Sequence, residues 1–233
     1  MRLDKFLSEA GIATRSELKK IIKAKQVSVN DEIITKADYK INEEKDIVKL
    51  LDEVIPYHKF MYYMLYKPAG YISATEGNVP CVIDLVPNIV KGLFPVGRLD
   101  KDTEGLLLIT NDGELGHKLL SPKKHVDKEY YVECRDQLTE EAVKAFESGM
   151  ELKDGTVFAK AECTHIEDYS CHLVLHEGKY HEIKRMFLSV GNEVTYLKRI
   201  RMKNLILDET LKKGEYRLLT DEELNHLKKD EQE

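Results

Sequence analysis

An uninterrupted apolar run, Leu106–Ile109, stands between two charged, turn-rich segments in the stretch GRLDKDTEGLLLITNDG, residues 97–113. Four consecutive apolar residues bounded by such segments are typical of a strand that is buried on both faces. A strand of this kind has to be covered by other packed elements. Asp100 lies just before it, next to Leu99 and close to Arg98. Taken alone, an acid in this place indicates a structural ion pair or a turn.

The pattern from residue 60 onward predicts an α+β fold. Apolar or alternating segments indicate strands at 60–66, 106–109, 129–134, 157–163, 171–175 and 194–206, and helical periodicity indicates helices at 114–120, 139–147, 181–190 and 221–228. Strands outnumber helices, and they do not alternate strictly with them. A mixed, mainly antiparallel sheet is therefore expected rather than a doubly wound parallel one.

The first fifty residues form a separate pattern. A helix is predicted up to Ala10 with Gly11 after it, and Thr14–Glu17 has the sequence of a capping box that opens a second helix. The alternating stretch QVSVNDEIIT, residues 26–35, then predicts a hairpin that turns at Asn30 and Asp31. Two basic helices followed by a hairpin resemble the S-four (alpha-L) RNA-binding domain. We predict this domain at residues 1–50, a linker at 51–59 and a catalytic domain at 60–233.

The charge distribution supports contact with RNA, although the whole chain carries a net charge of −6. Residues 1–26 hold seven bases and three acids, a local charge of +4, and residues 179–203 hold seven bases and two acids, a charge of +5. Local basic surfaces are typical of nucleic-acid-binding proteins. The candidate RNA-binding residues at the N-terminus are Arg2, Lys5, Arg15, Lys19, Lys20 and Lys23.

Several other classes of protein are not indicated. No run of about 18 apolar residues occurs and the N-terminus lacks an apolar signal core, which predicts a cytoplasmic protein without a membrane partner. The four cysteines form no CxxC pair, so we expect packed thiols rather than a disulfide or zinc site. The histidines, among them His181, have no metal-ligand spacing, and no dinucleotide fingerprint is present. Neither a metal nor a cofactor is expected.

Four motifs follow one another along the chain. They are YKPAGY at 66–71, GRLDKDTEGLLLIT at 97–110, KEYYV at 128–132 and EGKYHEIKRMF at 177–187. Together they resemble the RsuA/RluB branch of the pseudouridine synthases, and the resemblance covers nearly the whole chain, including the N-terminal domain. It implies an enzyme that isomerises uridine in RNA to pseudouridine without a cofactor.

The resemblance also implies roles for the acid and base residues. Asp100, in the GRLD motif, would act on the ribose, either by attack at C1′ or by removal of the C2′ proton. A carboxylate in a closed pocket needs a nearby cation. Lys184 is the matching candidate, but the adjacent Arg185 leaves the pairing open. Ile183 would pack against the uracil. Glu182 stands where the family more often has glutamine.

Two further residues have implied roles in the pocket. Tyr130 matches the tyrosine that stacks on the target base, whereas the alternation of a strand places Tyr131 on the opposite face. Arg98 would help hold the target nucleotide out of the RNA helix, because an enzyme that works on a base has to take it out of the stack. Lys67 and Pro68 are expected only to shape the floor of the active site.

Three functional hypotheses remain open on the sequence. The resemblance favours modification of one uridine in 16S rRNA, with a small-subunit assembly intermediate as substrate and the protein acting as a monomer. An enzyme of the same family that acts on 23S rRNA would share every catalytic motif. A catalytically silent rRNA-binding protein of ribosome assembly is the alternative from another class, and the presence of Asp100 and Tyr130 argues against it.

Overall fold

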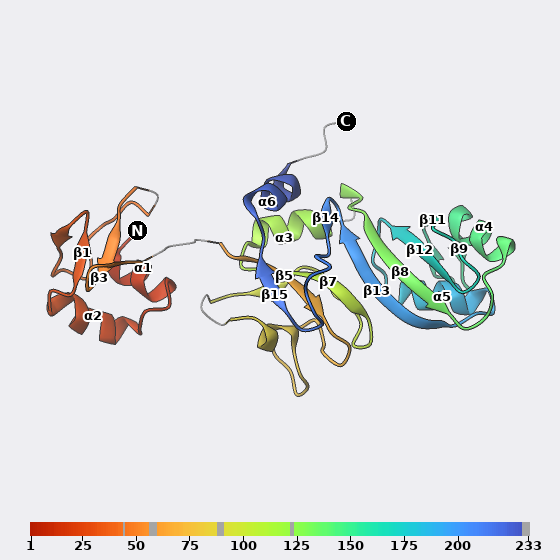
Figure 1. Ribbon diagram of the computed structural model, residues 1–233, viewed down its shortest axis with the longest axis horizontal. Coiled ribbons are helices and arrows are strands. Elements are labelled where there is room, and N and C mark those ends of the chain that lie inside the picture. Colours follow the sequence, from red (N-terminus) through yellow and green to blue (C-terminus); the bar gives the residue numbers. More distant parts are fainter. Residues whose placement is uncertain (44, 56–59, 88–90, 122–123, 230–233) are drawn as a thin grey trace. The chain divides into compact units, whose positions relative to one another are not determined.

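The computed structural model describes the chain except for residues 44, 56–59, 88–90, 122–123 and 230–233 (Figure 1). It divides into two compact units. The first comprises residues 1–61 and 87–92, and the second comprises residues 62–86 and 93–233. None of the described helices is both long enough and apolar enough to cross a membrane.

The first unit contains two helices and a four-stranded antiparallel sheet. The helices are α1 (Leu3–Glu9) and α2 (Arg15–Lys23), and the strands, in the order β2-β1-β3-β4, are β1 (Val27–Val29), β2 (Glu32–Ile33), β3 (Val48–Leu50) and β4 (Glu53–Val54). The predicted capping box is confirmed, since Thr14 Oγ1 accepts from the backbone of Glu17 and the Glu17 carboxylate accepts from the backbone of Thr14. The predicted turn is confirmed as well, with Asn30 and Asp31 both at positive φ.

The segment that follows β3 contains more structure than a linker. β4 pairs with β3, and the backbone N–H of Ile55 donates to Val48 O at 2.8 Å. The first sheet thus continues into the predicted linker at 51–59, of which residues 56–59 lie outside the described residues.

The second unit is built on one nine-stranded mixed sheet. Its main order is β11-β12-β8-β13-β7-β5-β15, with β14 added to β13 and β6 added to β7. The strands are β5 (Tyr62–Lys67), β6 (Phe94–Pro95), β7 (Glu104–Thr110), β8 (Lys128–Cys134), β11 (Glu162–Thr164), β12 (Ser170–Leu175), β13 (Val194–Met202), β14 (Leu205–Ile206) and β15 (Tyr216–Leu218). β13 and β7 are parallel, and every other pair is antiparallel. The predicted α+β class is confirmed.

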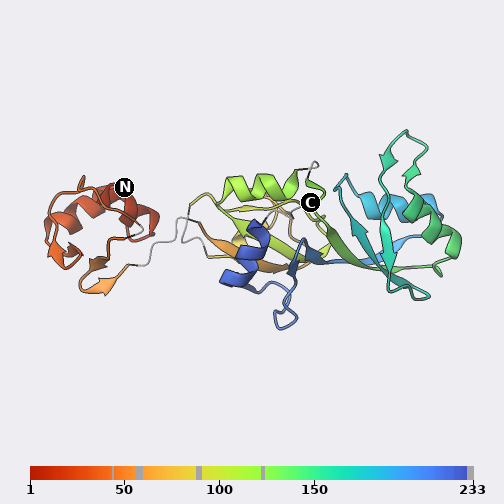
Figure 2. The ribbon, with the colours of Figure 1, turned by 90° about the horizontal axis from the view of Figure 1, so that it is seen from above.

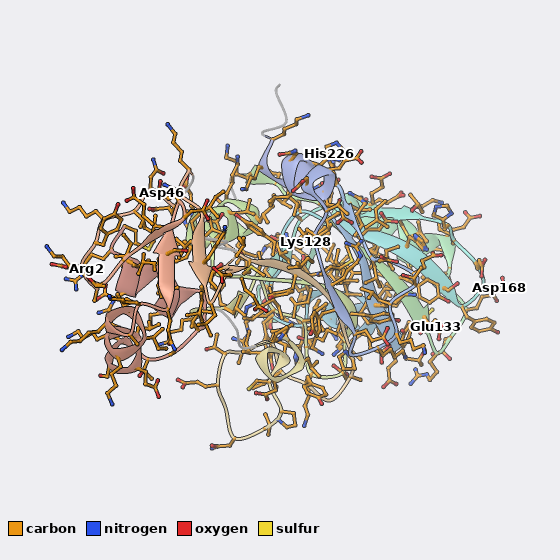
Figure 3. All side chains as sticks on the ribbon, turned by 60° about the vertical axis from the view of Figure 1, so that its left-hand side comes forward. Arg2, Asp46, Lys128, Glu133, Asp168 and His226 are labelled. Atoms are coloured by element: carbon orange, nitrogen blue, oxygen red, sulfur yellow. The ribbon has the colours of Figure 1, made fainter. Side chains whose placement is uncertain are left out.

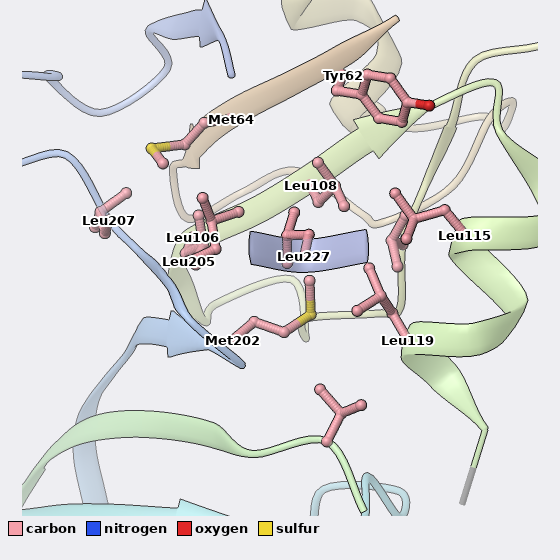
Figure 4. Packing of buried hydrophobic residues seen from close by; sticks show 12 residues of the cluster. Tyr62, Met64, Leu106, Leu108, Leu115, Leu119, Met202, Leu205, Leu207 and Leu227 are labelled. Carbon is pink, nitrogen blue, oxygen red and sulfur yellow. The ribbon is translucent and has the colours of Figure 1, made fainter. Parts of the chain in front are cut away.

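The strand predicted from the apolar run lies at the centre of this unit. All seven residues of β7 are buried. Leu106 and Leu108 pack in one cluster with Leu115 and Leu119 of α3 (Gly113–Leu120) and with Leu227 of α6 (Asp221–Lys228), as Figure 4 shows. Both helices therefore cover the same face of the central strands (Figure 2).

The other end of the sheet carries two more helices. α4 (Glu140–Ser148) and α5 (Glu182–Ser189) pack through Phe146 and Phe187, whose ring centroids lie 4.9 Å apart. The predicted strand at 157–163 is interrupted, because β10 (Val157–Phe158) pairs with β9 (Met150–Glu151) and β11 starts separately at Glu162. A short 3-10 helix, η1 (Val82–Leu85), precedes β6.

Gly105 is required where β7 passes β13. Its φ is +103°, and a Cβ at this position would lie 2.2 Å from the carbonyl oxygen of Arg199. We expect Gly105→Ala to destabilise the protein by about 3 kcal/mol or more, because backbone strain adds to a clash with backbone. Gly155→Ala is the matched control, since Gly155 also has a positive φ but meets nothing within 4 Å, and it should cost only about 1 kcal/mol. Chemical denaturation of both variants measures the difference, and equal losses would contradict the prediction.

Candidate active site

One pocket of the second unit brings together five of the six residues implied in catalysis. Asp100, Arg98, Tyr130, Ile183 and Lys184 line it. They come from the loop before β7, from β8 and from α5, so segments more than 80 residues apart in the sequence meet there. Arg185 is not among the residues that line the pocket.

The loop that carries Asp100 is held by hydrogen bonds to its backbone. Ser73 Oγ donates to Leu99 O at 2.9 Å, and the same hydroxyl oxygen accepts from Leu99 N at 3.0 Å. Asp100 O accepts from Thr103 N at 3.1 Å, which closes a turn just before β7. The Asp100 side chain is 28% exposed. A buried strand on one side and a buried serine on the other therefore fix a carboxylate that remains open to the pocket.

Lys184 is the cation that faces this carboxylate. Its Nζ lies 2.9 Å from Asp100 Oδ2 and 2.6 Å from Asp102 Oδ1. Burial lowers the pKa of Lys184, but hydrogen bonds to the two carboxylates outweigh burial, and the net shift is upward. Burial raises the pKa of Asp102, yet Lys184 brings it below its usual value. The lysine is held charged between two acids.

Arg185 points elsewhere. Its Nη2 lies 2.7 Å from Asp154 Oδ2 and 2.8 Å from Thr156 Oγ1. Consecutive residues of a helix point about 100° apart, so only one of the two neighbouring bases can face Asp100. The geometry selects Lys184.

Tyr130 lies on the pocket side of β8, as the alternation predicts. It is 8% exposed, and Tyr131 faces the other way, where its hydroxyl donates to Glu133 Oε1 at 3.0 Å. Burial raises the pKa of Tyr130, and Arg199 opposes that rise. A neutral, closely packed ring therefore forms one wall of the pocket.

Two buried cations near this wall were missed in the sequence. Arg199 is 1% exposed, lies opposite Tyr130 in the β8–β13 pairing and donates from Nε to Leu106 O at 2.8 Å. Lys128 lies within the body of the unit, whereas Glu133 lies at the far end of the same strand (Figure 3). Burial, followed by the charge of Arg199, lowers the pKa of Lys128. Leu197 and Arg199 are two positions apart on β13 and therefore point to the same face of the sheet. This spacing was the sequence signal that Arg199 would be buried.

His181 and Asp102 are also near Asp100 and were not predicted there. His181 Nε2 lies 3.6 Å from Asp100 Oδ1, and His181 precedes α5 in a left-handed backbone conformation with φ 50°. The sequence showed only that His181 has no metal-ligand spacing, because spacing along the chain does not show which side chains meet in the fold.

Lys67 is a buried lysine that does not line the pocket. It is fully buried, and its Nζ donates to the carbonyl oxygens of Pro68, Lys101 and Thr103 at 3.0, 3.3 and 2.7 Å. Burial lowers its pKa to about 8 although three nearby acids act in the opposite direction. The side chain ties the YKPAGY segment to the loop that carries Asp100.

Glu182 lies at the start of α5, where it is 4% exposed. Its Oε2 accepts from Lys179 N at 2.8 Å. Burial first, and then the neighbouring carboxylate of Glu177, raise the pKa of Glu182 to about 7. This acid is thus protonated in the folded protein over a pH range in which an ordinary glutamate is ionised.

This raised pKa predicts how stability depends on pH. Between the ordinary glutamate pKa of about 4.3 and the folded value of about 7, the folded state binds a proton that the unfolded chain does not, so stability falls as pH rises through that window. Glu182→Gln removes the titration. We expect the melting temperature of the variant to exceed that of wild type at pH 8 and to vary less from pH 5 to 8. The same change of melting temperature with pH in both proteins would contradict this prediction.

The described residues contain no cluster of three or more His, Cys, Asp or Glu side chains placed to hold a metal ion. All four cysteines are buried and free.

Two family models match the chain, each mainly within one compact unit. Residues 61–189 match the RNA pseudouridylate synthase family, and residues 1–48 match the S4 domain. The chain belongs to the RNA pseudouridylate synthase family and carries an N-terminal S4 domain.

Relatives and a solved structure agree over nearly the full length. The chain is 43% identical to an uncharacterised RNA pseudouridine synthase of Bacillus subtilis, over 97% of this chain and 98% of that one. It is 39% identical to ribosomal small subunit pseudouridine synthase A of Haemophilus influenzae, over 98% and 100% of the two chains. A crystal structure of a pseudouridylate synthase aligns with a TM-score of 0.70 at 36% identity, covering 97% of this chain and 99% of that one.

Proposed function

We propose that this enzyme converts one uridine of 16S small-subunit rRNA, at position 516, to pseudouridine. The observation that carries the enzymatic activity in this proposal is the Asp100–Lys184 pair at 2.9 Å in a pocket walled by Tyr130 and Ile183. The similarity to small-subunit pseudouridine synthases supports the choice of rRNA.

The reaction needs a carboxylate beside the ribose of the target nucleotide. The bond between uracil N1 and ribose C1′ breaks, the base turns, and a bond from C5 to C1′ replaces it while C5 loses a proton and N1 gains one. Asp100 acts on the ribose, either as nucleophile at C1′ or as base at C2′. Both routes build positive charge on the sugar, which a nearby carboxylate stabilises. Lys184, whose Nζ lies 2.9 Å from Asp100 Oδ2, holds that carboxylate in place.

The other residues of the pocket position the base. Tyr130 offers a flat face for stacking, and Ile183, which is 4% exposed, offers an apolar contact for the uracil. Arg98 is exposed at the pocket and can hold the backbone of a nucleotide that has left the RNA helix. We assign no catalytic role to Arg185.

Two alternative functions can be compared with the same observations. A 23S rRNA enzyme of this family would have the same pocket, so the choice of 16S rests on similarity to the small-subunit enzymes. A silent rRNA-binding protein of ribosome assembly would not need a carboxylate held by a charged lysine in an open pocket.

Mapping pseudouridine in rRNA from cells with and without this protein tests the proposal. The expected result is one pseudouridine that disappears from 16S rRNA in the deletion strain and returns with the wild-type gene. Loss of a site in 23S rRNA instead would establish the first alternative, and an unchanged map would overturn the enzymatic proposal.

We also propose that the enzyme acts as a monomer in the cytoplasm on a small-subunit assembly intermediate. The purified protein should modify 16S rRNA bound by early ribosomal proteins faster than naked 16S rRNA. Faster modification of the naked RNA would contradict the choice of substrate, and light scattering measures the oligomeric state.

The first unit is proposed to supply affinity for RNA. Arg15, Lys19, Lys20 and Lys23 are exposed on α2, whereas Arg2 lies 2.7 Å from Asp4 and Lys5 lies 3.7 Å from Glu9. Replacing the four α2 bases with glutamine in the full chain should weaken binding and reduce the log–log salt slope by up to about 0.9 for each lost contact to a duplex phosphate. The value of kcat at saturating RNA is the control and should stay unchanged. An unchanged slope would rule out phosphate contacts by α2.

A further inference from the structure

An exposed tyrosine lies immediately outside the active-site pocket. Tyr180 is 75% exposed, an unusual value for a large aromatic side chain. Its ring stacks on that of His181, with centroids 3.9 Å apart and planes inclined by 19°. One face of the tyrosine ring is covered by the histidine, and the high exposure leaves the other face open to solvent.

The histidine connects this ring to the catalytic carboxylate. His181 lines the pocket, and its Nε2 lies 3.6 Å from Asp100 Oδ1. Its left-handed backbone, with φ 50° and ψ 35°, is uncommon for a residue other than glycine and persists only where the surroundings impose it. This turn places the rings of His181 and Tyr180 in one stack, with the histidine beside Asp100 and the tyrosine in solvent.

The segment around Tyr180 is fixed on both sides. Lys179 Nζ donates to Val157 O at 2.6 Å and pairs with Glu177 Oε2 at 2.7 Å, and its backbone N–H donates to Glu182. The lysine on this segment is therefore engaged by the protein, whereas the neighbouring aromatic ring is presented outward. A fixed, open aromatic face is suited to a flat apolar partner rather than to a phosphate.

We propose that Tyr180 is a stacking platform for the base of a nucleotide next to the target uridine. The proposal rests on the proposed function, because it takes RNA as the substrate. When a uridine leaves the stack to reach Asp100, the adjacent base loses a neighbour, and an aromatic ring at the pocket rim replaces that contact. Base–aromatic stacking tolerates any base, so the platform adds affinity without selecting sequence.

Steady-state kinetics on the full-length protein separates stacking from other roles. Tyr180→Ala should raise KM for the RNA about ten-fold with kcat close to wild type, since one stacked base is lost. Tyr180→Phe should behave as wild type because the ring remains. Tyr169→Ala is the matched control: Tyr169 is 56% exposed and does not line this pocket, so its loss should leave KM unchanged.

A fluorescent base reports the contact directly. The probe is an RNA hairpin around the mapped target uridine with 2-aminopurine on its 5′ or its 3′ side. Wild type and Tyr180→Phe should quench the fluorescence at one of the two positions, and Tyr180→Ala should not. A lower kcat with unchanged KM in Tyr180→Ala would show that the tyrosine acts through His181 and would overturn the platform. Equal KM and equal quenching in wild type and Tyr180→Ala would also overturn the platform. If both proteins still form pseudouridine in that case, the proposed function stands. Absence of pseudouridine formation by wild type on 16S rRNA that carries early ribosomal proteins would overturn both.

Discussion

Asp100→Asn is expected to lower the rate of pseudouridine formation at least about 10⁴-fold, which is the scale of loss when a catalytic group is removed. Asparagine keeps nearly the same shape, but it can neither attack C1′ nor accept the C2′ proton. The loop is held by Ser73 and by the turn to Thr103, neither of which uses the Asp100 side chain, so RNA affinity should remain near wild type.

A second carboxylate in the same loop provides the control. Asp102 also contacts Lys184, at 2.6 Å, but its side chain is 72% exposed. Asp102→Asn should therefore lower the rate about ten-fold at most, because an exposed ion pair contributes little. Single-turnover rates and binding of the same rRNA decide the matter. A turnover by Asp100→Asn similar to that of wild type, or an equal loss in both variants, would remove Asp100 from its assigned role.

Lys184→Met is expected to lower kcat/KM about 10²-fold at neutral pH. The side chain is 25% exposed and lies between two carboxylates, and its loss frees Asp100 to move from the position that the reaction needs. The charge of Lys184 also holds the pKa of Asp102 below its usual value, so that pKa should rise in the variant. Asp102 left without this cation takes up a proton more readily, and the loss of activity should be larger at mildly acidic pH.

Neighbouring substitutions make this prediction specific. Arg185→Met should keep the wild-type pH–rate profile, because Arg185 contacts Asp154 and Thr156 instead of the pocket. Lys184→Arg should restore part of the rate, since it retains the charge. The acid limb of the profile is the measurement. A shift to higher pH in Arg185→Met and none in Lys184→Met would reverse the assignment.

Local patterns predicted most of the elements. The apolar run at Leu106–Ile109 is the middle of β7, the Thr14–Glu17 capping box opens α2, and Asp221–Lys228 is the last helix as predicted. These predictions hold because side-chain period, capping and turn residues act within a few positions of the chain. The interruption between β10 and β11 was missed, since an alternating stretch does not show which strand it will pair with.

The candidate site could be predicted in part. The motifs indicated Asp100, Tyr130, Ile183 and Lys184, and the structure places them around one pocket. The motifs favoured Lys184 as the cation but left Arg185 open as the alternative, because adjacent positions in a sequence do not show which way each side chain points. The rotation of α5 about its axis distinguishes the two residues, because it turns Lys184 and not Arg185 toward the loop that carries Asp100.

The sequence by itself determined the local structure, the two basic regions and the set of residues that the chemistry needs. Only the tertiary structure decided which of them meet. Arg199 lies opposite Tyr130 because β13 pairs with β8 through two register shifts, and His181 reaches Asp100 because a left-handed turn precedes α5. Contacts between residues so far apart depend on strand register and helix phase, which are set by the packing of the whole unit and not by any one segment.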